Sequence, residues 1–377
     1  MILKFAAIGI LFMSLMTAAC TKETVEEQRP GLVEEQADLP YQAEVAADQL
    51  DVPWEMDVAQ DGRIFIAERS GQVRVMIENQ LQSEPLIDLA EDIYQEAESG
   101  LLGLVLDPRF EQNHYLYVYH TYERDGALYN RVLRLKEQNN RAAVDRILLD
   151  GLGGGTSGNH NGGRMKIGPD GKLYVTMGEQ YQPLLAQDPN VRSGKILRIN
   201  LDGSIPSDNP TAGSPIYSMG HRNPQGLAWH PETGKLYASE HGQSAHDEIN
   251  IIEAGANYGW PVIEGDETSS EQPALKTPII HSGEETWAPS GITFVSQGPW
   301  KGHLLVANLR GQQVLRMTLD ASGEKVTDVQ ALFRSYGRIR NVYEAPGGVL
   351  YLMTNSRDGR GNPQEGDDKL IRLVPKG

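Results

Sequence analysis

One sequence unit recurs six times along this chain, and no other feature restricts its fold as strongly. The unit consists of an apolar segment, a turn with Gly, Pro or Asn, an alternating strand, a loop, and a short strand that often contains Arg. The third copy reads GRMKIGPDGKLYVTMGE and ends in KILRI at 195–199. The matching apolar positions of the six copies are Ile64, Leu116, Leu173, Leu236, Leu304 and Leu350. The order of elements is the same in every copy, although the spacing between copies varies.

Alternation of apolar and polar residues with period two predicts half-buried β-strands. Repeats of about 40–50 residues with three or four strands each are typical of a β-propeller. We therefore predict an all-β fold, a six-bladed β-propeller around a central channel. A β-sandwich would also contain many strands, but not six copies in one order. Residues 41–50 can add an outer strand to the last blade, which closes the ring and hides two sheet edges.

The composition agrees with short strands and disfavours several classes of function. Forty glycines and 21 prolines in 377 residues favour strands joined by turns over long helices. Lys and Arg number 34 against 51 Asp and Glu, a net charge of −17. This balance disfavours nucleic acid as a partner, because phosphates must be met by a basic face. The single cysteine, Cys20, excludes an internal disulfide bond and a cysteine-rich metal site.

The N-terminal segment predicts export. Residues 1–19 combine one charge, an apolar run and small residues, which is the pattern of a secretory signal peptide. Cys20 follows the small residues and resembles the acylated cysteine of a bacterial lipobox, although Thr17 stands where Leu is usual. Ordinary cleavage, which would leave a soluble protein, is the alternative. We expect residues 20–40 to form an acylated, flexible tether and residues 41–377 a single propeller domain. The protein would then be periplasmic and lipid-anchored, with no other contact to the membrane.

Two polar residues flank the strands of the third copy. His160 lies among glycines and asparagines in SGNHNGGR, a loop in which backbone can approach a ligand closely. A histidine at the mouth of a channel can act as a general base. Glu179 ends the following strand, where an acid can fix the tautomer and orientation of the imidazole. The alternatives are a histidine hydrogen-bonded within its own turn and a solvated carboxylate.

Two segments with arginine point to an anionic ligand. In GHRNPQG, Arg222 and Asn223 stand on a turn that displays their side chains. In RIRN, strand alternation places Arg338 and Arg340 on the same face. Two like charges there are unfavourable unless an anion or a carboxylate lies between them. We infer a multiply anionic ligand, with surface salt bridges as the alternative.

A further polar segment, SEHGQSAHDEINII, combines a glycine turn with the acidic pair Asp247–Glu248. Backbone carbonyls together with a carboxylate suit Ca²⁺, which prefers oxygen ligands. The sequence contains neither HExxH nor an EF-hand spacing, so zinc is disfavoured.

The ordered set of motifs resembles a known family. HNGGR, GKILRINLDGSIPSDNP, GHRNPQGLAW, SEHG with DEINII and NYGWP, and RIRN with GGVLY are similar to the soluble aldose sugar dehydrogenases that use pyrroloquinoline quinone (PQQ). These enzymes are related to soluble quinoprotein glucose dehydrogenase. The resemblance runs from about residue 50 to residue 374. It implies a six-bladed propeller, Ca²⁺, and a tricarboxylate quinone held over the channel by arginines.

The resemblance also implies roles for individual residues. His160 matches the general base, which takes the proton of the sugar's anomeric hydroxyl while hydride passes to the quinone. Glu179 matches the acid that orients this base. Arg222 and Asn223 match the pair that contacts the cofactor. Arg222 would also stabilise negative charge on the quinone oxygen.

Implied calcium ligands come from the end of the fourth copy and from the residues just after it. The turn Gly242–Gln243 matches the position whose carbonyls hold a Ca²⁺ that bridges to the cofactor. That ion would polarise the quinone as a Lewis acid. Glu248 and Tyr258 match a further Ca²⁺ site, Tyr258 through its backbone carbonyl.

Four positions complete the implied quinone site, and two of them depart from the family. Arg338 and Arg340 match the pair that grips the cofactor carboxylates. Glu98 stands where relatives commonly have a cofactor-contacting Gln, and a carboxylate beside a tricarboxylate is unfavourable unless it is protonated or turned away. Arg310 replaces the usual Lys, which keeps the charge but changes the geometry. Such changes either weaken cofactor affinity or mark a relative that does not use the quinone.

We therefore predict a quinoprotein oxidoreductase that oxidises the C1 hydroxyl of aldose sugars to lactones and passes electrons to an external acceptor. Two alternatives stay open at this point. A Ca²⁺-dependent lactonase needs several carboxylates converging on one ion, whereas this channel offers arginines. A non-catalytic propeller binding module would leave His160 and Glu179 without a task.

Overall fold

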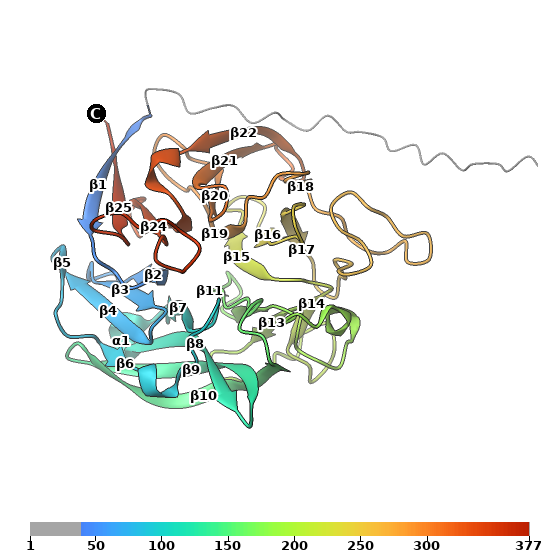
Figure 1. The fold of residues 1–377 in the computed structure, drawn as a ribbon, viewed down its shortest axis with the longest axis horizontal. Coiled ribbons are helices and arrows are strands. Elements are labelled where there is room, and N and C mark those ends of the chain that lie inside the picture. The colour runs from blue at the N-terminus through green and yellow to red at the C-terminus, as the bar shows by residue number, and fades with distance from the viewer. Residues whose placement is uncertain (1–38, 377) are drawn as a thin grey trace, which may run out of the picture.

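Six antiparallel sheets surround a central channel and form an all-β, six-bladed β-propeller, as predicted (Figure 1). The computed structural model describes residues 39–376. The predicted signal peptide, Cys20 and nearly all of the predicted tether therefore lie outside the described residues.

Every blade places its strands in the same order from the channel to the rim. The innermost strands are β2 (Pro53–Val58), β7 (Leu101–Leu106), β11 (Met165–Ile167), β15 (Pro224–Trp229), β19 (Pro289–Phe294) and β23 (Ile339–Glu344). The second strands are β3 (Ile64–Glu68), β8 (Tyr115–Arg124), β12 (Leu173–Met177), β16 (Leu236–Glu240), β20 (Leu304–Asn308) and β24 (Leu350–Thr354). Each second strand contains one of the six apolar positions identified in the sequence repeat, and all six side chains are buried.

The third strands are β4 (Gln72–Ile77), β9 (Ala127–Gln138), β13 (Lys195–Ile199), β17 (Glu248–Ile252), β21 (Gln313–Leu319) and β25 (Leu370–Pro375). The outer strands are β5 (Gln80–Leu81) with β6 (Ile87–Asp88), β10 (Arg141–Gly155), β14 (Ile216–Met219), β18 (Ile280–His281), β22 (Val326–Leu332) and β1 (Tyr41–Ala47). Strand β1 pairs with β25, so a segment from the start of the described chain completes the last blade. The predicted closure of the ring is confirmed, and it removes an exposed sheet edge.

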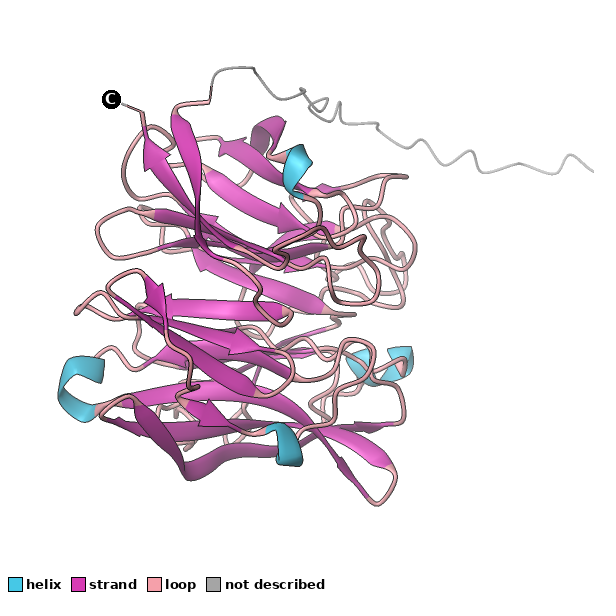
Figure 2. Ribbon diagram, turned by 60° about the vertical axis from the view of Figure 1, so that its left-hand side comes forward, coloured by secondary structure: helices cyan, strands magenta, loops and turns pink. Residues whose placement is uncertain are grey.

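Helices are few and short (Figure 2). They are η1 (Ala90–Asp92), α1 (Phe110–Asn113), η2 (Pro183–Gln187) and η3 (Arg334–Tyr336). Within residues 39–376, none of them has the length and apolar character needed to cross a membrane.

Apolar side chains fill the spaces between neighbouring blades and leave the channel polar. Between the first two blades, for example, Phe65 and Leu104 are almost fully buried in one cluster. In the channel itself, the Arg164 guanidinium forms an ion pair with Glu55, and both residues are at most 1% exposed. Glu55 also accepts a hydrogen bond from Asn341. This buried pair ties the inner strands together beneath the polar groups described next.

Candidate active site

Loops that enter and leave the third blade hold His160 and Glu179 against each other. The Nδ1 atom of His160 lies 2.8 Å from Oε1 of Glu179, and both side chains are buried. The other carboxylate oxygen of Glu179 accepts a hydrogen bond of 2.7 Å from the backbone N–H of Gln182. The carboxylate is therefore held at both oxygens, and the predicted contact between Glu179 and the imidazole ring is present.

The second ring nitrogen of His160 is left open. Within the described part of the chain, the hydrogen bonds of His160 involve only its Nδ1 atom and its backbone. The exposed ring of Tyr181 lies with its centroid 4.2 Å from the imidazole centroid. Gly178 packs against the backbone of the same residue, because a Cβ there would lie 2.1 Å from the carbonyl oxygen of His160. Among the described residues, Nε2 is therefore the ring nitrogen of His160 that is left available to a ligand.

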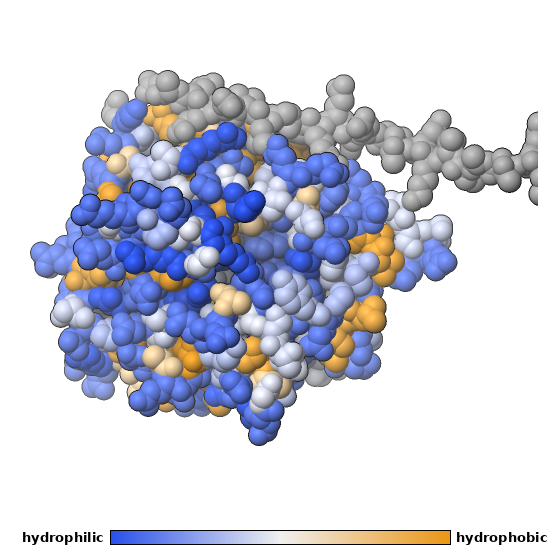
Figure 3. Space-filling view, viewed as in Figure 1, coloured by the Kyte–Doolittle hydropathy of each residue, from blue (hydrophilic) through white to orange (hydrophobic). Residues whose placement is uncertain are grey.

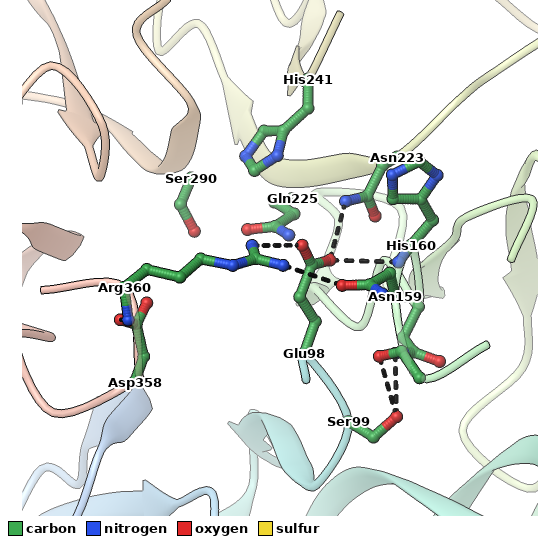
Figure 4. A network of polar contacts seen from close by, with 12 residues as sticks. Glu98, Ser99, Asn159, His160, Asn223, Gln225, His241, Ser290, Asp358 and Arg360 are labelled. Carbon is green, nitrogen blue, oxygen red and sulfur yellow. Dashed lines mark hydrogen bonds and ion pairs between the residues drawn. The ribbon is translucent and has the colours of Figure 1, made fainter. Parts of the chain in front are cut away.

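Glu98 is a charged group beside His160. Its Oε2 atom accepts hydrogen bonds from the backbone N–H of His160 at 3.1 Å and from Nδ2 of Asn223 at 3.3 Å. Its Oε1 atom lies 2.7 Å from the Arg360 guanidinium, which also donates to Asn159 (Figure 4). Burial acts to raise the pKa of Glu98, but the ion pair and hydrogen bond with Arg360 oppose it, and the pKa lies below its usual range. Glu98 is thus ionised rather than protonated, and it is not turned away from the site.

Arg338 lies just before β23, and a bulge between Ile339 and Asn341 interrupts the regular alternation on which the sequence prediction relied. Both Arg338 and Arg340 nevertheless approach one carboxylate. Arg338 forms an ion pair of 2.5 Å with Asp358, and Arg340 approaches the same carboxylate to 4.0 Å. Arg340 also donates to Gln225 and Ser290. Both arginines are buried, so the alternative of two surface salt bridges does not describe them.

Several buried polar nitrogen atoms at this end of the channel have no hydrogen-bond partner among residues 39–376. They are the Nε atoms of Arg69, Arg222 and Arg340 and the Nε2 atom of His241. Burial lowers the pKa of His241 to about 3, so this ring is neutral at physiological pH. Unpaired buried donors are uncommon, and here they fit an oxygen-rich anionic ligand. The centre of this face of the ring is correspondingly hydrophilic (Figure 3).

The turn that carries Arg222 and Asn223, which is predicted to contact the cofactor, is held by a second carboxylate. Arg222 donates from its side chain to the carbonyl oxygen of His241 at 3.2 Å, and its guanidinium lies 5.3 Å from the Trp260 ring centroid. The backbone N–H groups of Arg222 and Asn223 both donate to Glu240. Glu240 therefore fixes the position of both predicted residues.

Three of the four predicted calcium ligands lie around one small cavity. Gly242, Glu248 and Tyr258 line it together with Glu240 and other residues, whereas Gln243 lies beside it on the exposed turn. Burial, followed by repulsion from Glu240, raises the pKa of Glu248 to about 8. Within the described residues, no group of three or more His, Cys, Asp or Glu side chains is arranged to hold a metal ion.

Sequence reasoning missed four residues of this cluster, namely Arg69, His241, Asp358 and Arg360. Arg69, His241 and Asp358 are buried or nearly so, and all four line one pocket with Glu98 and Arg340. A charged and glycine-rich run, RDGRG at 357–361, was the available signal for two of them. Arg310, by contrast, is exposed on the turn after β20 and takes no part in these contacts.

Comparison with known proteins places the chain in a family. The family model for glucose/sorbosone dehydrogenase matches residues 50–372. Aldose sugar dehydrogenase YliI of Escherichia coli is 32% identical, with 88% of this chain and 92% of that protein covered. A putative oxidoreductase (glucose dehydrogenase) from Thermus thermophilus is 42% identical with a TM-score of 0.82, covering 89% of this chain and all of that one. The PQQ-bound aldose sugar dehydrogenase of Streptomyces coelicolor is 33% identical with a TM-score of 0.78, covering 92% and 99%. The chain belongs to the glucose/sorbosone dehydrogenase family.

Proposed function

We propose that this protein is a PQQ-dependent aldose sugar dehydrogenase, which oxidises the C1 hydroxyl of an aldose to the lactone. The single observation that carries the proposal is His160, whose Nδ1 is held by Glu179 while its Nε2 stays open at the channel mouth. The names of the relatives support the same reaction class. An external acceptor would take the electrons onward.

The residues present fit the quinone. PQQ carries three carboxylates, and the site offers a cluster of arginines with unpaired Nε donors at Arg69, Arg222 and Arg340. Arg338 and Arg340 would bind carboxylates of the cofactor, in competition with Asp358. Arg222 would face the quinone oxygen on which negative charge develops. When bound, the quinone would supply the two-electron acceptor for the hydrogen on the sugar's C1.

The protein's own part in the reaction is to position the sugar and move one proton. Nε2 of His160 would accept the proton of the C1 hydroxyl, as a general base must when it lies within hydrogen-bond reach. Glu179 would stabilise the charge that the imidazole then carries. Gln182 keeps this carboxylate in place through its backbone N–H.

The proposal includes Ca²⁺, because the groups around the small cavity are oxygen donors of the kind that this ion prefers. The carboxylates of Glu240 and Glu248 face one small cavity, and the raised pKa of Glu248 reflects their mutual repulsion as well as burial. A divalent cation with oxygen ligands would relieve that repulsion. Backbone carbonyls of Gly242, Gln243 and Tyr258 would complete the predicted sites.

Export and anchoring belong to the same proposal. A signal peptide at 1–19 and acylation of Cys20 would place the propeller in the periplasm, held at the membrane by its N-terminal tether. Replacement of Cys20 by Ala should release the protein into the soluble periplasmic fraction. Equal membrane association of the variant would contradict the anchor.

The decisive experiment is dye-linked oxidation of a panel of aldoses by the purified protein, with and without PQQ and Ca²⁺. We expect activity only when both are added. Chelation should also lower the melting temperature, because an ion bound to the native state alone stabilises it. A protein that neither binds PQQ in a titration nor oxidises any aldose would contradict the proposal.

A further inference from the structure

The Glu98 carboxylate poses a problem for a site that must accept a tricarboxylate. It is ionised, its side chain is only 15% exposed, and hydrogen bonds from His160 and Asn223 hold it at the mouth of the channel. A fixed negative charge in this place repels an incoming anion unless another group neutralises it.

Arg360 is the group in contact with this carboxylate. It comes from the loop between β24 and β25, 262 positions away in the sequence, and it reaches across the channel mouth (Figure 4). One terminal nitrogen donates to Glu98 at 2.7 Å, and the other donates to Asn159 at 2.8 Å. The two contacts fix the planar guanidinium group in one orientation beside the loop that carries His160.

The same loop is anchored on its other side. Asp358, two residues before Arg360, accepts the ion pair from Arg338 and a hydrogen bond of 2.9 Å from the backbone N–H of Arg360. Asp368 accepts hydrogen bonds from the backbone of Ser356 and Arg357, where the loop begins. The loop therefore places the Asp358 carboxylate beside the arginine pair and the Arg360 guanidinium beside Glu98.

A charge count shows why this arrangement matters. Four guanidinium groups and two carboxylates meet here, namely Arg69, Arg338, Arg340 and Arg360 with Glu98 and Asp358. They leave two positive charges in excess, and removal of Arg360 would leave one. His241 adds nothing at neutral pH, because burial holds it neutral.

We propose that Arg360 is a further positioning residue of the quinone site, which neutralises Glu98 and so allows the site to accept the tricarboxylate. The inference rests on the proposed function. Glu98 and Arg360 act as a matched pair, in which Glu98 without Arg360 would leave an uncompensated negative charge at the site.

The test is a titration of each protein with PQQ in the presence of Ca²⁺. Binding is monitored by the quenching of tryptophan fluorescence. The variants are Arg360→Gln, Glu98→Gln and the double variant. Arg360→Gln should weaken binding at least tenfold, because it leaves the half-buried Glu98 carboxylate without its ion-pair partner beside the cofactor. Glu98→Gln should bind as tightly as the wild type or more tightly. The double variant should recover most of the affinity, because two glutamines can form a neutral hydrogen-bonded pair.

Arg109→Gln is the matched control, since it removes an exposed arginine outside this cluster. It should leave the affinity unchanged. Unaltered binding by Arg360→Gln would overturn the inference, and so would a double variant as weak as Arg360→Gln, which would mean that Arg360 grips the cofactor directly. Failure of the wild type itself to bind PQQ would overturn the proposed function as well. The melting temperature of each variant shows whether it is folded. Recovery of affinity in the double variant is a second control, because only a folded site can bind PQQ.

Discussion

Two histidine–glutamate pairs lie on neighbouring blades and have almost the same first contact. His160 meets Glu179 at 2.8 Å, and His221 meets Glu240 at 2.9 Å, in both cases through Nδ1 and over 19 positions of sequence. The two pairs differ in what the second ring nitrogen faces. Nε2 of His221 is hydrogen-bonded to Ser218 at 2.8 Å, and the ring is stacked on Tyr258.

The two carboxylates differ as well. Glu179 uses its second oxygen to bind one backbone N–H, at Gln182. Glu240 uses its second oxygen to bind the backbone N–H groups of Arg222 and Asn223, which are predicted to contact the cofactor. A histidine that is hydrogen-bonded to a glutamate is therefore not sufficient to define a catalytic base. The open second nitrogen is the reason why we propose the base at His160. The contacts of the second Glu240 oxygen are the reason why we propose a positioning role for the other pair.

The largest expected effect is the loss of the open imidazole. His160→Ala should lower the turnover of the quinone-loaded enzyme by about 10²- to 10⁴-fold, the range that a general base contributes. Cofactor affinity and melting temperature should stay close to those of the wild type. Steady-state oxidation of the best aldose, after saturation of the enzyme with PQQ, measures this effect. Substantial residual turnover would contradict the role of His160 as the general base.

His221→Ala is the matched control, and its effect should appear in stability instead. The residue is fully buried, and its removal leaves Ser218 and Glu240 without their partner. An unsatisfied buried group costs about 1–3 kcal/mol, and the vacated volume adds to that. Thermal unfolding should show a clear decrease in melting temperature while turnover per loaded molecule is largely kept. A specific loss of turnover at unchanged stability would break the comparison.

Exchange of each glutamate for glutamine sharpens the distinction. In Glu179→Gln, the new amide NH₂ must face either the Gln182 N–H or His160 Nδ1. In the first case two donors face each other. In the second case Nδ1 must accept, so the ring proton moves to Nε2 and this nitrogen can no longer act as a base. Turnover should fall about 10- to 100-fold, in line with a charged hydrogen bond of about 1.5–3 kcal/mol. Glu240→Gln meets the same conflict at Arg222 and Asn223, and should weaken PQQ binding more than turnover. Titration and steady-state kinetics on both variants separate the two outcomes, and identical profiles would contradict the assignment.

Much of the fold was predictable because it depends on local pattern. The six apolar positions of the repeat lie in the second strand of each blade, and Tyr41–Ala47 pairs with β25 as expected. These inferences need only the preference of a strand for burying one face. Alternation in RIRN does not by itself explain why Arg338 and Arg340 meet one carboxylate, because a bulge between Ile339 and Asn341 interrupts the period of the strand.

The remaining part of the site depends on loops that cross the channel. Nothing in the local sequence shows that Arg360 meets Glu98, because the length and direction of a loop follow from the packing of distant blades. The same holds for Asp358, which supplies a carboxylate to Arg338 from outside the repeat. The distinction between His160 and His221 is also invisible in sequence, because it depends on which atoms lie at Nε2 in three dimensions.

The smallest expected effect comes from freeing the second imidazole. Ser218→Ala removes the partner of His221 Nε2 and should cost about 1–2 kcal/mol of stability, measured by thermal or denaturant unfolding, with no change in turnover. The variant gives His221 the same unpaired nitrogen that His160 has, yet the ring stays fully buried against Tyr258, where no sugar can reach it. Combined with His160→Ala, it should therefore restore no activity. If the combined variant did recover turnover, a free nitrogen beside an oriented carboxylate would be sufficient, and access would not be what separates the two pairs.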